Sequence, residues 1–205
     1  TALKNFDINK NIAFKELFNL IGKKEKLNIN DLGYLIGPIL NAGGRLGKSN
    51  FASELLSSND IELVNIKSNE LIKLNDQRKK IETLILDGID FHKIESENKD
   101  VIIYYDPSIN EGLIGIIAAR LKDYFNKPSI VITNSNELLK GSARSVFNYN
   151  IGKAIKNSLD KNILINGGGH NAAAGFTLHK SYLENFKNFI LKDFSNTGSV
   201  RNNIF

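Results

Sequence analysis

The chain has 205 residues, of which 41% are hydrophobic, and its 27 lysines and arginines against 22 aspartates and glutamates give a net charge of +5. The absence of cysteine excludes disulfides, zinc-thiolate sites and cysteine nucleophiles, and the sequence has neither an apolar run of the ~20 residues that cross a bilayer nor a signal-peptide layout. We therefore expect a cytoplasmic protein of one large or two small domains, with a basic surface that weakly favours a polyanionic partner.

The first part of the chain predicts short helices. Residues 11–21 place apolar side chains near one face, and Gly22 follows where a helix would stop. A second helix is expected over 31–37, ended by Pro38, because the residue before a proline disfavours the helical conformation. A third helix is expected over 50–56, beginning at an asparagine that can cap it.

A long connecting helix is expected next. Between Asp60 and Gly88 there is neither glycine nor proline, and apolar side chains recur every three or four residues, which is the spacing of one helix face. The charged segment 95–100 makes the best domain boundary. We therefore predict a helical connector over 1–94, a second domain over 95–194 and a flexible tail over 195–205.

The second half changes to a pattern of alternating strands and helices. Strands are expected over 101–106 and 129–134, with a helix over 111–125 between them, most simply as a right-handed parallel crossover. The later elements are a strand over 140–146, a helix over 151–159, a glycine-rich turn leading into a fourth strand within 167–178, and a last helix from Ser181. The predicted fold class is α/β, a helical connector with a long helix followed by a small mixed β-sheet domain flanked by helices.

The first candidate site is the glycine-rich segment GPILNAGGRLG, residues 37–47. Its glycines permit unusual backbone angles and the close approach of a ligand. The segment would present the side chains of Asn41 and Arg45, and a guanidinium can bind a phosphate in bidentate fashion. An ordinary turn between two helices with a surface arginine fits the same spacing, so both interpretations stay open.

The second candidate site follows the first strand of the sheet, where Asn110, Glu111 and Gly112 precede a helix. Free N–H groups and the helix dipole favour an anion there, and ligands of open α/β sheets bind at this end of the strands. The alternative is a plain helix start, in which small residues such as Gly115 only pack against the sheet.

Two further candidates lie among the later strands. In KGSARS, residues 140–145, Arg144 alternates with small residues that leave room for a phosphate or sugar, although basic side chains also protect edge strands. In GGGHNAAAG, residues 167–175, three consecutive glycines are hard to explain by packing. Their N–H groups could form a nest for an anion beside His170, or the segment could be a flexible turn with an incidental histidine.

Together and in this order, the four segments resemble the RecJ-like exonucleases of the DHH phosphoesterase family. The resemblance covers about residues 10–190 and includes LNDQRKKIE in the long helix. It implies a 5′-to-3′ exonuclease that acts on single-stranded DNA in repair and recombination, with Mn²⁺ or Mg²⁺ as cofactor. In that family the aspartates and histidines that bind two metal ions precede the matched region. This chain starts at Thr1 and has no methionine, so we expect a C-terminal part that binds no metal and is inactive alone.

The resemblance also assigns roles to residues. Asn75, Gln77 and Arg78 match the family in the long helix and would be structural or would contact the strand. Asn110 stands where the family usually has a histidine, and an amide can bond to a phosphate but cannot carry a proton charge. The substrate-binding residues that we predict, with His170 also a candidate for catalysis, are Asn41, Arg45, Asn110, Glu111, Gly112, Arg144, Ser145, Gly168, Gly169 and His170.

The partner that the resemblance implies is single-stranded DNA, with a single-strand-binding protein or a helicase as further candidates. We expect a monomer without membrane association. Two alternatives stay open: a DHH-family phosphodiesterase for short oligonucleotides or cyclic dinucleotides, and a nucleic-acid-binding module without catalysis. The segment 37–47 and the long connector favour the exonuclease over both.

Overall fold

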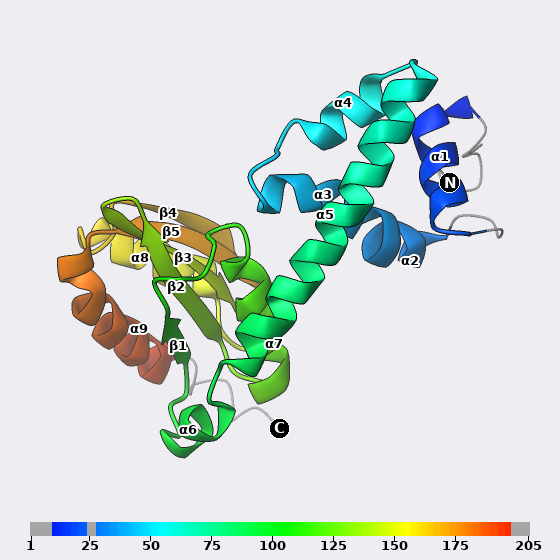
Figure 1. Ribbon diagram of the computed structural model, residues 1–205. Helices are drawn as coiled ribbons and strands as arrows, with labels where there is room; N and C mark the ends of the chain where they lie inside the picture. The colour runs from blue at the N-terminus through cyan, green and yellow to red at the C-terminus, as the bar shows by residue number, and fades with distance from the viewer. Residues whose placement is uncertain (1–9, 24–27, 198–205) are drawn as a thin grey trace. The chain divides into compact units, whose positions relative to one another are not determined.

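The computed structural model describes residues 10–23 and 28–197. They belong to two compact units, Thr1–Thr83 and Leu84–Phe205 (Figure 1). In the described part of the chain, no helix is long and apolar enough to span a membrane. The division lies before the predicted boundary at 94/95, because side chains just after it, such as Ile85, Leu86 and Ile89, pack into the core of the second unit.

The N-terminal unit is helical, as predicted. Helix α1 (Ile12–Leu20) begins after Asn11, whose side chain accepts a hydrogen bond from the first turn, and it stops before Gly22, which has a φ of +69°. Helices α4 (Phe51–Ser57) and α5 (Ile61–Asp87) match the predicted third helix and the predicted long helix. The core of this unit consists of Ala13, Leu17, Phe18, Ile36, Ile39, Ala42, Leu55, Val64, Leu71 and Leu74.

The segment between α1 and α4 differs from the prediction. Helix α2 (Ile29–Asp31), a π-helical turn (Leu32–Ile36) and α3 (Gly37–Arg45) follow one another directly. Pro38 therefore does not end a helix. It stands at the start of α3, where a missing N–H is tolerated, and most of the predicted glycine-rich turn at 37–47 is helix.

The C-terminal unit contains a five-stranded mixed sheet with the strand order β1-β2-β3-β5-β4. Strands β1 (Ile102–Tyr105) and β2 (Ser129–Ser135) are parallel and are joined by α7 (Ile114–Phe125), which confirms a parallel crossover. Strands β3 (Leu138–Arg144), β5 (Ala173–Leu178) and β4 (Asn166–His170) continue the sheet in antiparallel pairing. The predicted α/β fold class is confirmed. The segment at 167, predicted as a glycine-rich turn, is instead strand β4, so the sheet has five strands where four were expected.

Helices cover both sides of this sheet. Helices α8 (Ile151–Asp160) and α9 (Leu183–Thr197) pack on one side, over a core that includes Ile130, Leu139 and Phe176. Helix α7 packs on the other side, against β2 and β3, and α6 (Phe91–Ser96) lies near its end. Figure 1 colours the elements in chain order, from blue at the N-terminus to red at the C-terminus.

The C-terminal end of α9 corrects the predicted tail over 195–205. The helix continues to Thr197, and within its last turn the hydroxyls of Ser195 and Thr197 donate to the carbonyls of Lys192 and Asp193. Residues 198–205 lie outside the described residues. Helix α7 also starts later than the expected 111–125, because residues 111–113 form a turn.

Candidate nucleic-acid interface

The strand register places three rows of side chains on one face of the sheet. Residues directly opposite each other in antiparallel strands point to the same side, and alternate residues along a strand point to opposite sides. We call this set the open face; its rows are Lys140–Thr177–Asn166, Ser142–Gly175–Gly168 and Arg144–Ala173–His170. The intervening residues of β3 and β5 are buried under α8 and α9. Helix α7 covers the β2–β3 part of this face. The β5–β4 part has no such cover and is exposed.

The middle row of the open face lacks bulk. A Cβ on Gly168 would have no atom within 4 Å, and a Cβ on Gly175 would meet only the Gly141 carbonyl at 3.8 Å. Neither residue has a positive φ. Neither packing nor backbone conformation therefore requires glycine at these two positions, and both leave the sheet backbone accessible to a ligand.

The other two glycines of the triplet have a structural reason. A Cβ on Gly167 would lie 2.8 Å from Cγ2 of Ile155, and one on Gly169 would lie 2.3 Å from the Ala173 carbonyl oxygen. A Cβ on Gly152 of α8 would lie 2.8 Å from the backbone of His170, so helix and strand are in direct contact. The interpretation of the triplet as an anion-binding nest is wrong, because it is a strand. Packing also explains Gly169, which was predicted to bind substrate.

The guanidinium of Arg144 is held over the open face. Its Nη1 donates to Oγ of Ser142 at 3.1 Å and to the carbonyl of Ala143 at 2.8 Å. A Cβ on Gly115 in the first turn of α7 would lie 3.0 Å from Nη2 of the arginine. Gly115 therefore leaves room for the guanidinium, which agrees with the packing interpretation of that glycine.

His170 lies in the same row as Arg144, separated from it by Ala173. Two strand spacings amount to about 10 Å between the two backbones. The imidazole is exposed, and its Nδ1 accepts a long hydrogen bond of 3.4 Å from the N–H of Ala172. In the neutral ring this leaves Nε2–H as the donor available to a ligand.

The turn before α7 is less suited to an anion than predicted. Asn110 uses its Oδ1 to accept the N–H of Gly112 at 2.8 Å. Oε2 of Glu111 accepts from Ser135 at 2.6 Å and lies 3.3 Å from Nζ of Lys140. These hydrogen bonds, that from Ser135 first, lower the pKa of Glu111, and the carboxylate is already engaged by Ser135 and Lys140.

Ser145 is not presented to a ligand. Its side chain is buried at 7% exposure, and its Oγ donates to the carbonyl of Tyr149 at 2.8 Å. The residue follows β3 and turns toward the core. These contacts support a structural role for Ser145 rather than the predicted binding of substrate.

The N-terminal unit carries Asn41 and Arg45 one turn apart on α3, with Asn41 exposed and Arg45 half-buried. Burial lowers the pKa of Arg45, the nearby Arg78 lowers it further, and the Glu82 carboxylate opposes the shift. Gly43 belongs to the packing of the unit, because its Cβ would lie 2.5 Å from the carbonyl oxygen of Lys48.

The long helix α5 holds a buried polar network. Nη1 of Arg78 lies 2.6 Å from Oε2 of Glu82, and Nη2 donates to Oδ1 of Asn75 at 2.7 Å. Asn75 and Glu82 are each 5% exposed. The sequence left a structural or a strand-contacting role open for Asn75 and Arg78. In the structure their side chains hydrogen-bond to each other, whereas Gln77 is exposed.

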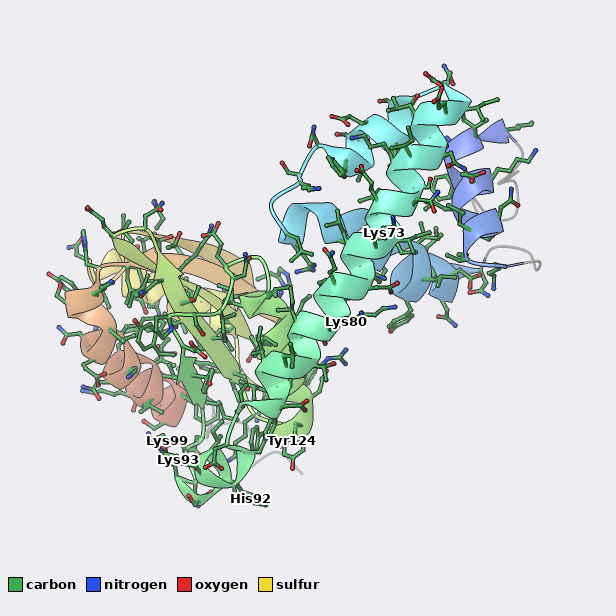
Figure 2. The ribbon with its side chains drawn as sticks, viewed as in Figure 1. Lys73, Lys80, His92, Lys93, Lys99 and Tyr124 are labelled. Carbon is green, nitrogen blue, oxygen red and sulfur yellow. The ribbon has the colours of Figure 1, made fainter. Side chains whose placement is uncertain are left out.

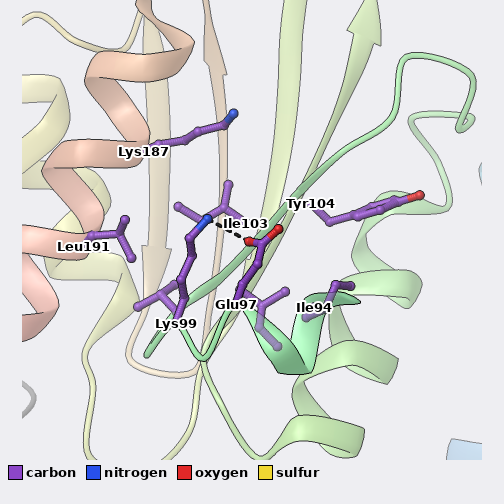
Figure 3. A pocket seen from close by; sticks show the side chains of 9 residues that line it. Ile94, Glu97, Lys99, Ile103, Tyr104, Lys187 and Leu191 are labelled. Atoms are coloured by element: carbon purple, nitrogen blue, oxygen red, sulfur yellow. Dashed lines mark hydrogen bonds and ion pairs between the residues drawn. The ribbon is translucent and has the colours of Figure 1, made fainter. Parts of the chain in front are cut away.

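A small pocket lies apart from the open face (Figure 3). It has a volume of about 90 Å³, and none of the predicted substrate-binding residues borders it. Lys99 and Glu97 form an ion pair of 2.7 Å at its edge. Figure 2 shows Lys99, Lys93 and His92 near one another at the α6 end of this unit. The residues that line the pocket are Ile94, Glu97, Lys99, Val101, Ile102, Ile103, Tyr104, Lys187 and Leu191.

The described residues do not fit a catalytic metal ion. Among them, no three His, Asp or Glu side chains are grouped so that they could hold one. Mn²⁺ and Mg²⁺ prefer carboxylate oxygens, and the Glu111 carboxylate beside the open face is engaged by Ser135 and Lys140. What these residues can do is bind and orient a phosphate-bearing strand.

Of the predicted residues, the open face brings together Arg144, Gly168 and His170. The sequence interpretation missed Ser142, Gly175 and Thr177 on this face, since it took β4 for a turn and so had no register for β5. The alternation of small and polar residues in KGSARS and in AAGFTL is the signal that could have revealed them.

Comparison with known proteins agrees with this geometry. The DHHA1 domain model matches residues 98–196. The chain is 32% identical over 184 residues to the single-stranded-DNA-specific exonuclease RecJ of Haemophilus influenzae, and 31% identical over 171 residues to that of Escherichia coli. The alignments cover 86% and 80% of this chain but 32% and 30% of the relatives, so the chain spans about a third of their length. The crystal structure of Thermus thermophilus RecJ with Mg²⁺ shares the fold, with a TM-score of 0.76 and 24% identity over 90% of this chain and 28% of that one.

Proposed function

The chain carries a DHHA1 domain and is homologous to the RecJ single-stranded-DNA-specific exonucleases, and from this we propose that it is the substrate-binding part of a nuclease of that kind. Its ligand is single-stranded DNA, and the open face is the surface that binds it. The observation that carries the proposal is the combination of a held guanidinium, Arg144, with two accessible glycines in the neighbouring row, Gly175 and Gly168.

The chemistry of the open face suits a single strand. Arg144 offers a planar set of donors to a phosphate, and His170 offers one more from the far side of the same row. The glycines let a sugar or a base lie directly on the sheet, which needs a strand whose bases are unpaired. A duplex keeps its bases stacked inside and presents two phosphate backbones, which do not match one narrow strip.

Hydrolysis in the intact enzyme is proposed to use Mn²⁺ or Mg²⁺, which activates water and stabilises the phosphoryl transition state when bound. Since the described residues do not fit the metal, its ligands belong to other parts of the enzyme, and this chain alone is inactive. The role of the chain is to hold the strand in place. The proposal further includes digestion from 5′ to 3′ and a setting in DNA repair and recombination. It also includes a cytoplasmic location, a monomeric state, and a single-strand-binding protein or a helicase as partner.

The proposal is tested by comparing the affinity of the wild-type chain and an Arg144→Ala variant for single-stranded DNA. Loss of a charge-assisted phosphate contact of about 1.5–3 kcal/mol predicts a weakening of roughly tenfold or more. The slope of log affinity against log salt should fall by about 0.7, the value for one phosphate of a single strand.

The matched control is Lys187→Ala, which removes one positive charge from α9 on the other side of the sheet. It should leave affinity nearly unchanged. Equal effects of the two substitutions would mean that the chain attracts DNA only through its net charge, and the open face would lose its assignment.

A further inference from the structure

Lys140 is the second basic residue of the open face, and its amine lies beside the Glu111 carboxylate. Nζ lies 3.3 Å from Oε2 of Glu111, and the same oxygen accepts from Oγ of Ser135 at 2.6 Å. Ser135 is at the end of β2, opposite Leu138 and thus beyond Lys140 along the sheet. The lysine side chain is therefore drawn toward the end of the sheet, away from the row of Arg144.

The two basic residues mark two separate positions along β3. Lys140 and Arg144 are four residues apart on the same face, about 13 Å at the usual rise of a strand. The guanidinium of Arg144 bends over Ser142, whereas the amine of Lys140 bends toward Glu111. Because their charged groups have different partners in different rows, one phosphate group cannot contact both, and two phosphates of one strand can.

The surroundings of Lys140 offer space and donors for a further nucleotide. An open hollow of about 710 Å³ lies beside it, at the end of the β2–β3 hairpin. Its polar lining includes Thr177, which is in the same row as Lys140, and the exposed His179 just after β5. A hydroxyl and an imidazole can both donate to phosphate or sugar oxygens. The complete lining is Ser135, Asn136, Glu137, Leu138, Lys140, Thr177 and His179.

We propose that Lys140 forms a second phosphate-binding position, which engages the strand only when it extends past the Arg144 row into this hollow. The inference rests on the proposed function of the open face. It adds that Lys140 makes this face prefer longer strands to shorter ones. Glu111 is a positioning residue that orients the amine. The Lys140–Glu111 pair is 48% and 47% exposed at its side chains, so it is a weak surface ion pair. An ammonium has three N–H donors, so it can bond to a phosphate while it keeps Glu111.

The test uses a Lys140→Ala variant and two ligands, a dinucleotide and a single strand of about eight nucleotides, a length within the usual range for one binding domain. Chemical-shift titration follows the weak ligand and fluorescence anisotropy the longer one. We expect severalfold weaker binding of the longer strand, with its salt slope reduced by about 0.7, and no change for the dinucleotide. Arg144→Ala should weaken the binding of both ligands, and Lys187→Ala should affect neither.

Two substitutions of Glu111 separate positioning from contact. Glu111→Gln keeps an oxygen that accepts from Ser135 and Lys140, so the preference for the longer strand should persist. Glu111→Ala removes that acceptor, and the preference should fall by less than it does for Lys140→Ala, because the lysine charge remains and the ion pair is weak. Melting temperatures show that each variant is folded.

An equal effect of Lys140→Ala on both ligands, or no effect on either, overturns the second position. Retention of the full length preference in Glu111→Ala overturns the positioning role. If the wild-type chain binds neither ligand, the proposed function itself fails. If the wild-type chain binds both ligands equally well, the proposed function stands and only the second phosphate-binding position fails.

Discussion

Glycine serves two different purposes within one strand of this protein. Gly167 and Gly169 lie where a side chain would collide with Ile155 or with the neighbouring strand, so they allow close packing. Gly168, between them, points to the open face and has no neighbour within 4 Å of a Cβ. Because the free protein would tolerate a side chain there, our proposal explains this glycine by the ligand that the open face would bind.

Alanine substitutions separate these purposes. Gly168→Ala should leave the free energy of unfolding the same or slightly higher, since alanine loses less entropy than glycine on folding, and it should weaken single-strand binding severalfold. Gly169→Ala should lower the free energy of unfolding by about 1–3 kcal/mol through overpacking. Urea unfolding and anisotropy titration measure both quantities. Full affinity in a stable Gly168→Ala protein would remove the glycine from the binding surface.

At the level of single residues, the sequence alone singled out Arg144, Gly168 and His170 by residue type and spacing, and the fold brings these three to one face of the sheet. It gave no sign of the structural contacts of Ser145 and Gly169, which depend on the side of the strand that each occupies. It also took Glu111 for an anion-site residue, since only the fold shows that Ser135 and Lys140, distant in the chain, meet its carboxylate.

The helices and strands show where local sequence patterns suffice. The periodicity of α5 and the apolar runs of β1 and β2 predicted these elements, because their burial follows directly from spacing. Helix α3 and strand β4 were missed because both are rich in glycine, which has low intrinsic preference for either structure. Tertiary packing decides there: Gly43 lets α3 pack closely, with the Lys48 carbonyl and Leu71 beside it, and Gly152 lets α8 contact β4.

Tyr149 adds a polar and an aromatic contact to the apolar packing of helix α9 on its unit. The phenol donates to Oδ2 of Asp193 at 3.0 Å, and its ring meets Phe194 edge-on, with centroids 5.0 Å apart. Burial raises the pKa of Tyr149 well above its ordinary value, and the negative charge of Asp193 raises it further. The folded state therefore keeps this proton at a pH where the unfolded chain releases it.

The sign of the resulting pH dependence follows from that shift. The contribution of Tyr149 is fully present below about pH 10, the ordinary pKa of tyrosine, and is lost progressively above it. Tyr149→Phe should be less stable than the wild type by about 1 kcal/mol at pH 8, because one hydrogen bond is missing. The difference should shrink as the pH rises past 10, and denaturant titrations at several pH values measure it. A gap that stays constant or widens at high pH contradicts this account of Tyr149.

The whole molecule combines two units of different character. The N-terminal unit is helical and encloses the Asn75–Arg78–Glu82 network, and the C-terminal unit is a DHHA1 domain whose sheet carries the open face. Composition predicted the basic surface, with 27 cationic against 22 anionic residues. Charge alone, however, does not distinguish single-stranded from double-stranded nucleic acid, since both are polyanions. In our proposal the distinction comes from the accessible glycines of the open face, Gly168 and Gly175.

The most direct test of the central claim is the binding of the purified chain to a fluorescent single-stranded DNA of about twenty nucleotides, across a salt series, against the same sequence as a duplex. We predict tighter binding of the single strand at every salt concentration, with an affinity that falls linearly on logarithmic axes as salt rises. Equal or tighter binding of the duplex, or no binding at low salt, would contradict the assignment of the open face as a single-strand-binding surface.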